Sequence, residues 1–406
     1  MKKIFTFLFI SILFLYFHNS LAADASPEKD TNMKTQVAAN TDFTLSLYRN
    51  LKNETKISNL FFSPYSISTA LAMVYGGARG ETQKQIANAL HFTLSDDSLH
   101  RTFGDLQKRL IQENKSKGCQ LFLANALWMQ KNEQFLKEFL TLVSNYSAGL
   151  RQLDFIAETE SSRQVINSWI GEKTNDNIKD LIPSGAIDEN TRLILTNAIY
   201  FKGKWKFEFE KSETKKADFF TLKKRKIEVN MMHLKENFKY YADEKLQAVE
   251  LPYKSNEISM FIMLPKEIND IEKTESLLTS HYLNDITTKL NTNEIDLFFP
   301  KFKITWGTSS LRNSLIKMGM TDAFANADFS GINGKADLFL SDVLHQAVIE
   351  VNEEGTEATA ATGGVIELSI ADEPTTFRVD HPFIFFIKDN RSGSILFMGR
   401  VTEPSK

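Results

Sequence analysis

Apolar positions in the first half of the chain recur with the spacing of an α-helix. One buried helical face is predicted where they repeat every fourth residue, at Phe43, Leu47 and Leu51. Ser63 is a suitable N-cap and Pro64 suits the first helical position, so another helix is expected to begin there. Further helical patterns cover residues 81–90, 98–112, 134–146 and 162–173.

The second half of the chain has the patterns of strands. Residues 192–205, RLILTNAIYFKGKW, are too apolar for a half-exposed strand and predict a buried central one. Residues 246–265 predict two strands joined by a polar turn at 254–257. Strand-rich segments continue at 294–304, 337–351 and 382–401. Helices first, strands later and no regular βαβ alternation indicate the α+β class.

The first 22 residues have the pattern of a secretory signal peptide. Two lysines follow Met1, an apolar run covers residues 4–17, and small residues occupy 20–23. The run is shorter than the roughly 20 residues that a membrane helix needs, and no later apolar run is long enough. We therefore expect a secreted, extracellular protein with no membrane partner.

The remaining chain has no obvious internal boundary. Its length would suit two or three domains, but no linker rich in Pro, Gly or Ser occurs after residue 40. We therefore expect an N-terminal extension over residues 23–40 and a single domain over residues 41–406. Cys119 is the only cysteine, so no internal disulfide can form and a large core must hold the fold together.

Composition and motifs exclude several classes of function. A net charge of -3 argues against a nucleic-acid partner. The seven histidines include no pair with metal-ligand spacing, so no metal site is predicted. No G-x-S-x-G nucleophile motif occurs, and the glycine-rich segments at 76–81 and 331–336 lack the phosphate-loop pattern. We therefore expect neither a cofactor nor an enzyme.

Two basic clusters and four glycosylation sequons are candidate surface sites. One cluster is KKRK at residues 223–226, and the other combines His100, Arg101, Lys108 and Arg109. Either could bind a polyanion such as a glycosaminoglycan, with a solvated surface as the competing interpretation. N-glycosylation sequons begin at Asn53, Asn114, Asn145 and Asn390, and chance matches to so short a pattern are the alternative.

The segment NEEGTEATAATGGVIELSIADEP, residues 352–374, lies between two strand-like segments. Read with period two from residue 355 to 368, one face holds Thr356 and small or apolar residues without charge, whereas Glu357 and Glu367 share the other face. Small side chains and the absence of proline would let this stretch enter a sheet as a strand. The same composition is also typical of a loop.

The sequence resembles the serpin family from residue 42 to residue 403. The resemblance is carried by segments that occur in the family's order: NLFFSPYSIS (59–68), TNAIYFKGKW (196–205), FPKFKI (299–304), EEGTEATAAT (353–362), HPF (381–383) and FMGRV (397–401). It implies three β-sheets, about nine helices and an exposed reactive-centre loop. It also implies a monomeric serine protease inhibitor. In such inhibitors the cleaved loop inserts into the central sheet and the protease stays attached as an acyl-enzyme.

The resemblance assigns roles to individual residues. Glu353 and Lys301 resemble an ion pair where the loop leaves its strand, near Trp205 in the region that opens first. We expect this pair to be partly exposed and to contribute under about 1 kcal/mol. A polar cluster that controls separation of the central strands is expected at Ser63, Ser66, Asn197 and His345. The hinge of the loop is expected at Glu353, Glu354, Gly355, Thr356, Glu357, Ala358, Thr359, Ala360, Ala361 and Thr362.

Two positions remain open for the bond that a protease would cleave. Family spacing from Glu353 gives Ser369–Ile370, whereas counting back from HPF favours Leu368–Ser369, which we prefer because leucine fills a specificity pocket better. Neither bond follows Arg or Lys, so chymotrypsin-like or elastase-like proteases are the expected partners. A non-inhibitory serpin with a carrier, chaperone or storage role is the alternative, but the small hinge residues favour inhibition. An exported hydrolase is disfavoured because the nucleophile motif is missing.

Overall fold

The computed structural model describes residues 27–404 apart from residues 57, 116–117, 147 and 357–373. Within this part of the chain the helices are α2 (Pro27–Thr55), α3 (Pro64–Gly77), α4 (Gly80–Ala89), α5 (Asp96–Lys115), α6 (Lys137–Val143), α7 (Thr159–Lys173), α8 (Ile271–Ser276), α9 (Ser280–Lys289), α10 (Arg312–Lys317) and α11 (Ser330–Asn333). Two short 3-10 helices are η1 (Lys211–Glu213) and η2 (Asp322–Phe324).

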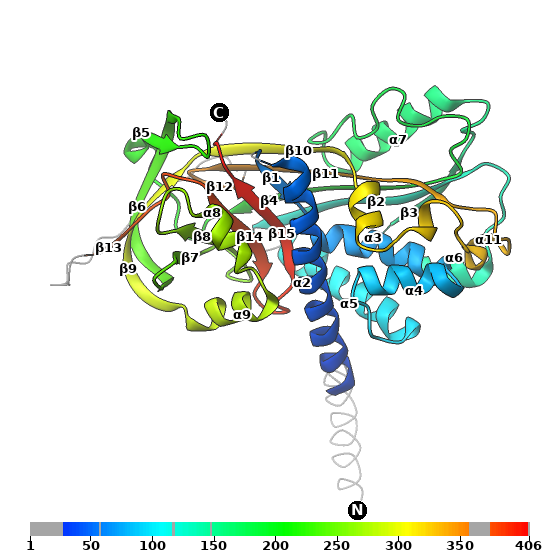
Figure 1. Ribbon diagram of the computed structural model, residues 1–406, viewed down its shortest axis with the longest axis horizontal. Helices are drawn as coiled ribbons and strands as arrows, with labels where there is room; N and C mark the ends of the chain where they lie inside the picture. The colour runs from blue at the N-terminus through cyan, green and yellow to red at the C-terminus, as the bar shows by residue number, and fades with distance from the viewer. Residues whose placement is uncertain (1–26, 57, 116–117, 147, 357–373, 405–406) are drawn as a thin grey trace, which may run out of the picture.

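A six-stranded sheet extends across the molecule (Figure 1). Its strands, in spatial order, are β10 (Phe302–Ser310), β11 (Leu340–Asn352), β12 (Gly355–Thr356), β4 (Leu193–Lys204), β2 (Cys119–Gln130) and β3 (Gly149–Leu153). Strands β11 and β4 also pair directly and in parallel, from Leu340 opposite Leu193 to Val348 opposite Tyr200. The two-residue strand β12 therefore separates β11 from β4 at one end only.

The other strands form a nine-stranded hydrogen-bonded network. Its members are β1 (Leu60–Phe62), β15 (Ile395–Val401), β14 (Phe383–Asp389), β8 (Ile258–Pro265), β7 (Leu246–Pro252), β6 (Lys226–Ala242), β9 (Asn291–Pro300) and β13 (Thr375–Arg378), with β5 (Lys215–Phe220) also paired to β6. One end of the long strand β6 pairs with β7 and the other with β5, so β6 joins two smaller sheets. Division at β6 gives the three expected sheets.

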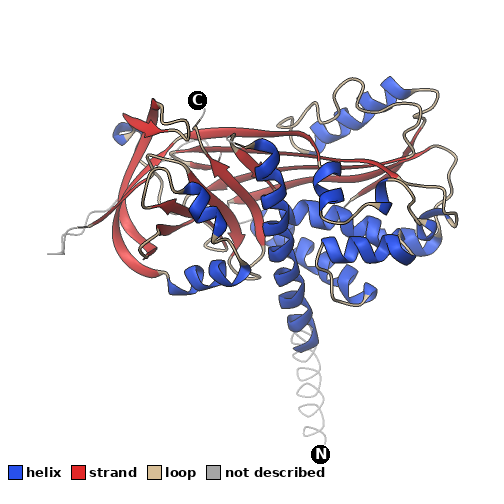
Figure 2. Ribbon diagram, in the orientation of Figure 1, coloured by secondary structure: helices blue, strands red, loops and turns tan. Residues whose placement is uncertain are grey.

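Both faces of the six-stranded sheet are covered (Figure 2). Alternate residues of β4 point to opposite faces, because side chains alternate along a strand. Ile194 and Ala198 belong to a small core beneath α7, whereas Leu195 and Ile199 belong to the main core with α3 and α5. Burial on both faces explains why this strand is apolar almost throughout, as its sequence predicted.

Most elements expected from the sequence are present. Helix α3 begins after Ser63, whose hydroxyl accepts a hydrogen bond from the Ser66 N–H, and Pro64 is its first residue. Helix α6 is shorter than the predicted 134–146. The backbone before it is hydrogen-bonded to another part of the chain, because the Leu136 N–H donates to the Ile332 carbonyl at 2.8 Å. The α+β class is confirmed.

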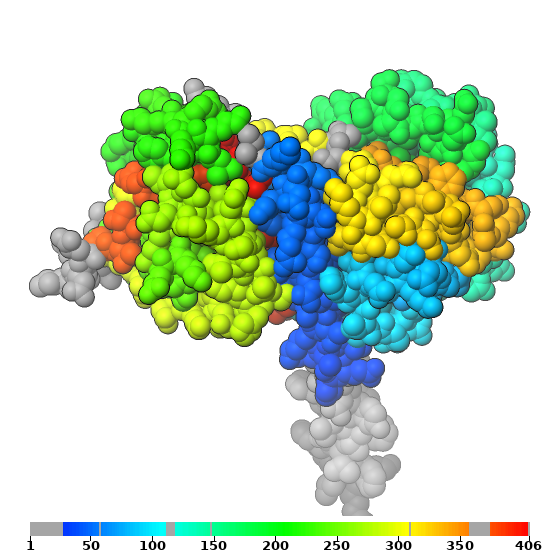
Figure 3. Space-filling model, viewed as in Figure 1, coloured from blue at the N-terminus to red at the C-terminus, as the bar shows by residue number. Residues whose placement is uncertain are grey.

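Helix α2 crosses the boundary that the sequence suggested at residue 40. Within the described residues it continues without a break from Pro27 to Thr55. Val37 and Ala39, which belong to the expected N-terminal extension, are buried. The space-filling view places this helix between the two halves of the molecule (Figure 3). The packed fold therefore begins several residues before the expected boundary.

Candidate functional site

The hinge starts where the chain leaves β11. After Asn352 the chain turns through Glu353 and Glu354, and Gly355 and Thr356 then run back as β12 between β11 and β4. The register pairs are Val351 with Thr356 and Asn352 with Gly355 on one side, and Lys204 with Gly355 and Gly203 with Thr356 on the other. The first residues of the expected loop are thus already a strand of the sheet.

Position 355 requires glycine, for two reasons. Its φ is +147°, in the region that side chains disfavour. A Cβ atom at residue 355 would lie 2.1 Å from the Gly203 carbonyl oxygen, because the β12 backbone is close against β4. We conclude that any side chain here would prevent β12 from pairing with β4.

Thr356 is fully buried. Its hydroxyl oxygen lies 2.9 Å from the hydroxyl oxygen of Tyr253. The Tyr253 ring stacks on the indole of Trp205, with ring centroids 4.6 Å apart. Thr356 therefore lies on the face that the sequence alternation assigned to the core.

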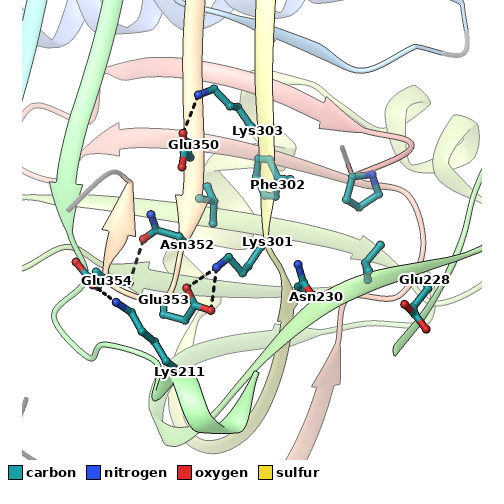
Figure 4. Close-up of a pocket in the computed structure, with 13 residues that line it drawn as sticks. Lys211, Glu228, Asn230, Lys301, Phe302, Lys303, Glu350, Asn352, Glu353 and Glu354 are labelled. Carbon is teal, nitrogen blue, oxygen red and sulfur yellow. Dashed lines mark hydrogen bonds and ion pairs between the residues drawn. The ribbon is translucent and has the colours of Figure 1, made fainter. Parts of the chain in front are cut away.

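Two ion pairs hold the turn that precedes β12 (Figure 4). The Lys301 ammonium contacts both carboxylate oxygens of Glu353, at 2.7 and 3.0 Å, and the Thr214 hydroxyl donates to the same carboxylate at 2.9 Å. The Lys211 ammonium lies 2.5 Å from the carboxylate of Glu354. The pairing of Lys301 with Glu353 that the sequence suggested is therefore present in the structure.

The Glu353 carboxylate is more buried than the sequence suggested, since only 6% of its side chain is exposed. Burial raises the pKa of Glu353, but the hydrogen bonds from Lys301 and Thr214 outweigh burial and leave the pKa below its ordinary value. Removing Lys301 would leave a largely buried carboxylate without its ammonium partner, which costs about 1–3 kcal/mol. This cost measures the exposure of Glu353 to the loss of its partner and is separate from the net contribution of the pair.

Trp205 fixes the same turn through backbone contacts. Its indole N–H donates to the Asn352 carbonyl at 3.0 Å, and its backbone N–H donates to the Glu354 carbonyl at 3.1 Å. The Phe209 N–H donates to the Glu353 carbonyl at 2.9 Å. Trp205 and Lys301 therefore both lie at the end of the sheet where β12 separates β11 from β4.

A cleft of about 460 Å³ opens beside this turn (Figure 4). The lysines on its wall are paired with carboxylates: Lys211 with Glu354, Lys301 with Glu353, and Lys303 with Glu350. The hydrogen bond from Lys211 to Glu354 raises the pKa of Lys211, so this ammonium is a poor base.

The polar cluster between the central strands is also formed. His345 on β11 is the register partner of Asn197 on β4, and the His345 Nδ1 atom lies 2.5 Å from the Asn197 side-chain oxygen. The backbone N–H of Ser63 points to His345 Nε2 at 3.3 Å, so Nε2 accepts and Nδ1 carries the proton. Burial lowers the pKa of His345 to about 3. His345 is therefore a neutral core residue that bridges the two strands.

The cluster extends across both sheets. The Asn197 amide donates to the Ser66 hydroxyl at 2.7 Å and to the side-chain oxygen of Asn125, a residue of β2. The Ser63 hydroxyl donates to the Leu396 carbonyl of β15 at 2.6 Å. Separating β11 from β4 along their whole length must break the His345–Asn197 contact.

Sequence reasoning missed several residues of these two sites. Tyr253, Lys211 and Thr214 contact the hinge, and Asn125 belongs to the strand cluster. Tyr253 and Thr356 are 103 positions apart, and Lys211 and Glu354 are 143 apart. Short motifs and local periodicity carry no signal for pairs so distant in sequence.

The rest of the loop lies outside the described residues. This applies to the expected reactive bond at Leu368, Ser369 and Ile370 and to residues 357–362 of the hinge. The flanking strands are described: β12 belongs to the six-stranded sheet, whereas β13 pairs in parallel with β9 in the nine-stranded network. The undescribed segment thus connects two different sheets.

The candidate surface sites differ in exposure. Asn53 is exposed on α2, the side chain of Asn114 is outside the described part, and Asn145 is half-buried. Asn390 is exposed, but its amide nitrogen contacts the Ser259 hydroxyl at 2.8 Å and the Asn256 carbonyl at 3.2 Å. The amide of Asn390 is therefore already hydrogen-bonded, as is that of Asn145, which donates to the Leu142 carbonyl at 3.0 Å.

His100 does not belong to a basic surface cluster. It is buried, its Nδ1 atom lies 2.6 Å from the Tyr146 hydroxyl, and burial lowers its pKa to about 4. The surface interpretation of this residue was wrong because it lies on the inner face of α5. Arg101 and Lys108 are exposed on that helix, and in the KKRK segment Arg225 pairs with Glu403 at 2.6 Å.

In the described part of the chain no group of three or more His, Cys, Asp or Glu is placed to hold a metal ion. Among the helices described there, none is both long enough and apolar enough to cross a membrane.

Comparison with known proteins gives a consistent result. The family model "Serpin (serine protease inhibitor)" matches residues 38–404. A leukocyte elastase inhibitor of Bos taurus is 42% identical over 383 residues, covering 92% of this chain and all of the relative. A serpin-like protein of Methanosarcina acetivorans is also 42% identical, over 90% of this chain and 87% of the relative. The crystal structure of uncleaved ovalbumin superposes with a TM-score of 0.83 at 30% identity, covering 91% of this chain and all of that one.

Proposed function

The chain belongs to the serpin family, and we propose that it inhibits serine proteases as a suicide substrate. The observation that carries the proposal is the position of β12, because the hinge already separates β11 from β4 at one end of the sheet. Insertion of the remaining loop would extend this existing strand. It would not have to begin a new one.

The register of β12 defines where the rest of the hinge would lie. Thr356 pairs with Gly203 and Val351 in antiparallel ladders. Continued two residues at a time, the ladder would set Ala358 opposite Phe201 and Ala360 opposite Ile199. Both partners belong to the main core, so only small side chains would fit without displacing packed residues. This requirement accounts for the run of Ala and Thr.

The same register predicts what happens at the strand cluster. Six positions after Thr356, Thr362 would arrive between Asn197 and His345. Their direct contact would have to break for the strand to pass, and the threonine hydroxyl is a suitable replacement partner for both. The central cluster would then be a barrier to premature insertion that the inserted strand itself removes.

The covalent step follows ordinary serine protease chemistry. The protease serine oxygen attacks the carbonyl carbon of the bait residue, a C–O ester bond forms, the peptide C–N bond breaks, and the released amine takes the proton. Loop insertion then carries the attached protease away from its starting position. About 13 residues at roughly 3.3 Å each span about 43 Å, enough to cross a large sheet. Inhibition requires insertion to precede hydrolysis of the ester.

Leu368–Ser369 remains the preferred bait bond, with Ser369–Ile370 as the alternative. Leucine suits the apolar specificity pocket of chymotrypsin-like and elastase-like proteases. Similarity to leukocyte elastase inhibitors supports the same target class. The sequence offers no Arg or Lys at either bond for a trypsin-like pocket.

The remaining aspects of the proposal rest on the sequence. Residues 1–22 support secretion, and residues 23–406 would form the mature chain. In a glycosylating host, Asn53 is the preferred sequon, because it is exposed and the Asn390 amide already contacts Ser259 and Asn256. Arg101 and Lys108 on α5 offer a surface for a glycosaminoglycan, without His100. The active species is expected to be a monomer.

Incubation with chymotrypsin, elastase and trypsin, followed by denaturing gels, tests the function. A complex that survives SDS with chymotrypsin or elastase is expected. Cleavage without a complex would identify a substrate and favour a non-inhibitory role. Turnover of an ester in the absence of protease would indicate a hydrolase and overturn the proposal.

A further inference from the structure

The hydroxyl of Tyr253 faces the first buried residue of the hinge. Tyr253 follows β7 and is fully buried, and its oxygen lies 2.9 Å from the oxygen of Thr356. Burial raises the pKa of Tyr253 well above its usual value, so the phenol stays protonated. Either hydroxyl can be the donor in this bond. Tyr253 lies directly after β7, a strand of the nine-stranded network, so this contact links β12 to a part of the fold outside the six-stranded sheet.

The Tyr253 ring is held in place from two sides. It stacks on Trp205 with an interplanar angle of 14°, and it meets the edge of Phe201 with centroids 5.0 Å apart. The backbone of Trp205 also forms a β-bridge with that of Tyr253. A phenol ring fixed in this way presents its hydroxyl at a defined point, which is what a positioning group requires.

Gly203 makes room for this ring. It is the register partner of Thr356 on β4, and a Cβ atom there would lie 2.9 Å from Tyr253 Cδ1 and 2.8 Å from Phe201 Cζ. The tyrosine thus occupies the volume that a side chain on β4 would fill. Because Gly203 has no side chain, the ring can approach β4 closely, and the Tyr253 hydroxyl then reaches Thr356, the register partner of Gly203.

We propose that Tyr253 is a positioning residue for loop insertion, which fixes Thr356 in the gap between β11 and β4 and so sets the register of the strand that follows. This inference rests on the proposed inhibitory function. A one-residue slip in register would exchange the two faces of the inserted strand. It would place Glu357 where Thr356 lies and bring a charge into the main core.

The physical signature of this role is a coupling between the two hydroxyls. In Tyr253→Phe the Thr356 hydroxyl would remain buried without this partner, and in Thr356→Val the Tyr253 hydroxyl would. Loss of one partner is costly, whereas loss of both can be nearly neutral when shape is preserved. Each single change is expected to raise the fraction of molecules in which β12 is not paired with β11 and β4 by about threefold to tenfold. In the double variant this fraction should be close to that of the parent protein.

Hydrogen–deuterium exchange of the intact protein tests the coupling without any protease. The amides of Gly355 and Thr356 should exchange about threefold to tenfold faster in each single variant. Thr356→Ser, which keeps the hydroxyl, should exchange like the parent. Tyr240→Phe is the matched control. It also removes a tyrosine hydroxyl, one that donates to the Gln247 side-chain oxygen at 2.8 Å and does not contact the hinge. Additive effects in the double variant, or no effect in either single, would overturn the inference.

A second measurement separates positioning from general stability. With chymotrypsin or elastase in limiting amounts, Tyr253→Phe and Thr356→Val should give more cleaved inhibitor per complex formed, while the rate of bait cleavage stays unchanged. The double variant should recover the parent ratio. If the parent forms no complex, the proposed function fails, but the exchange experiment still decides whether Tyr253 positions the hinge. Equal slowing of cleavage and complex formation would contradict the positioning role.

Discussion

Replacing Thr356 with Arg should convert the protein from an inhibitor into a substrate. Thr356 is fully buried beside Tyr253 and opposite Gly203, where the neighbouring groups are aromatic rings and backbone. The two nearest carboxylates in sequence, Glu353 and Glu354, lie in the preceding turn and are already paired with Lys301 and Lys211. A guanidinium at residue 356 would therefore have to be buried unpaired or leave the sheet.

The magnitudes predict that the hinge leaves the sheet. An unpaired buried charge costs about 3–5 kcal/mol. The two-residue strand β12 is held by a few ladder bonds, each worth about 0.5–1.5 kcal/mol, against an ordering cost of about 1–2 kcal/mol per residue. The hinge is thus too weakly held to keep an arginine buried. The rest of the fold should persist, because its cores do not depend on β12.

Insertion would then become much slower than in the parent protein. A penalty of about 3 kcal/mol at the first step corresponds to a slowing on the order of a hundredfold. Attack at the distant bait bond should be unaffected, since the scissile residues are more than ten positions away in sequence. Hydrolysis of the acyl-enzyme would therefore precede insertion, and cleaved inhibitor and free protease would be the products.

Denaturing gels and a titration of residual protease activity measure this outcome. Glu357→Arg is the matched control, because the β12 register would place residue 357 opposite Lys202, which is half-buried and faces away from the main core. This control should still form complexes. A Thr356→Arg protein that trapped protease in stoichiometric, SDS-stable complexes would refute the account of the hinge.

Three further outcomes follow from the same structure. Chymotrypsin-like or elastase-like proteases should be inhibited far faster than trypsin, and mass spectrometry of the released C-terminal fragment should find Ser369 or Ile370 at its start; a start before Val365 or after Asp372 would show the bait bond to be misplaced. His345 has a folded pKa of about 3 against an ordinary 6.5, so its neutral form stabilises the fold above pH 6.5 and that stability is lost as pH falls towards 3, by roughly 4 kcal/mol. The unfolding free energy of His345→Gln should lack this part of the pH dependence, and an unchanged slope would refute the assignment. Lys301→Met should loosen the hinge by about 1–3 kcal/mol, seen as faster amide exchange at Glu353 and Glu354, whereas unchanged exchange would show that the ion pair contributes little.

The sequence predicted those features that depend on local pattern. Ser63 and Pro64 mark the start of α3 because capping chemistry is local. The apolar run in β4 indicates burial on both faces, and alternation from Gly355 onward assigns Thr356 to the core face. In each case the signal lies within a few residues of the feature.

Features that depend on distant contacts could not be predicted in this way. The contact of Tyr253 with Thr356 joins two residues 103 positions apart, and nothing in the segment around Tyr253 indicates a partner in the hinge. His100 was grouped with basic neighbours because sequence spacing does not reveal which face of α5 is buried. The Glu353 carboxylate was expected to be more exposed, because its burial depends on Thr214 and Lys301 from other elements.

The central claim is that the cleaved loop becomes a strand of the six-stranded sheet. Thermal unfolding of the intact chain and of a chain cleaved only at the bait bond tests this claim most directly, with cleavage confirmed by mass spectrometry. Insertion adds ladder hydrogen bonds and buries apolar surface between β11 and β4, so the cleaved chain should unfold at a temperature well above that of the intact chain. A cleaved chain that unfolds at the same temperature or below would contradict the account, because a nick in an ordinary surface loop gives that result.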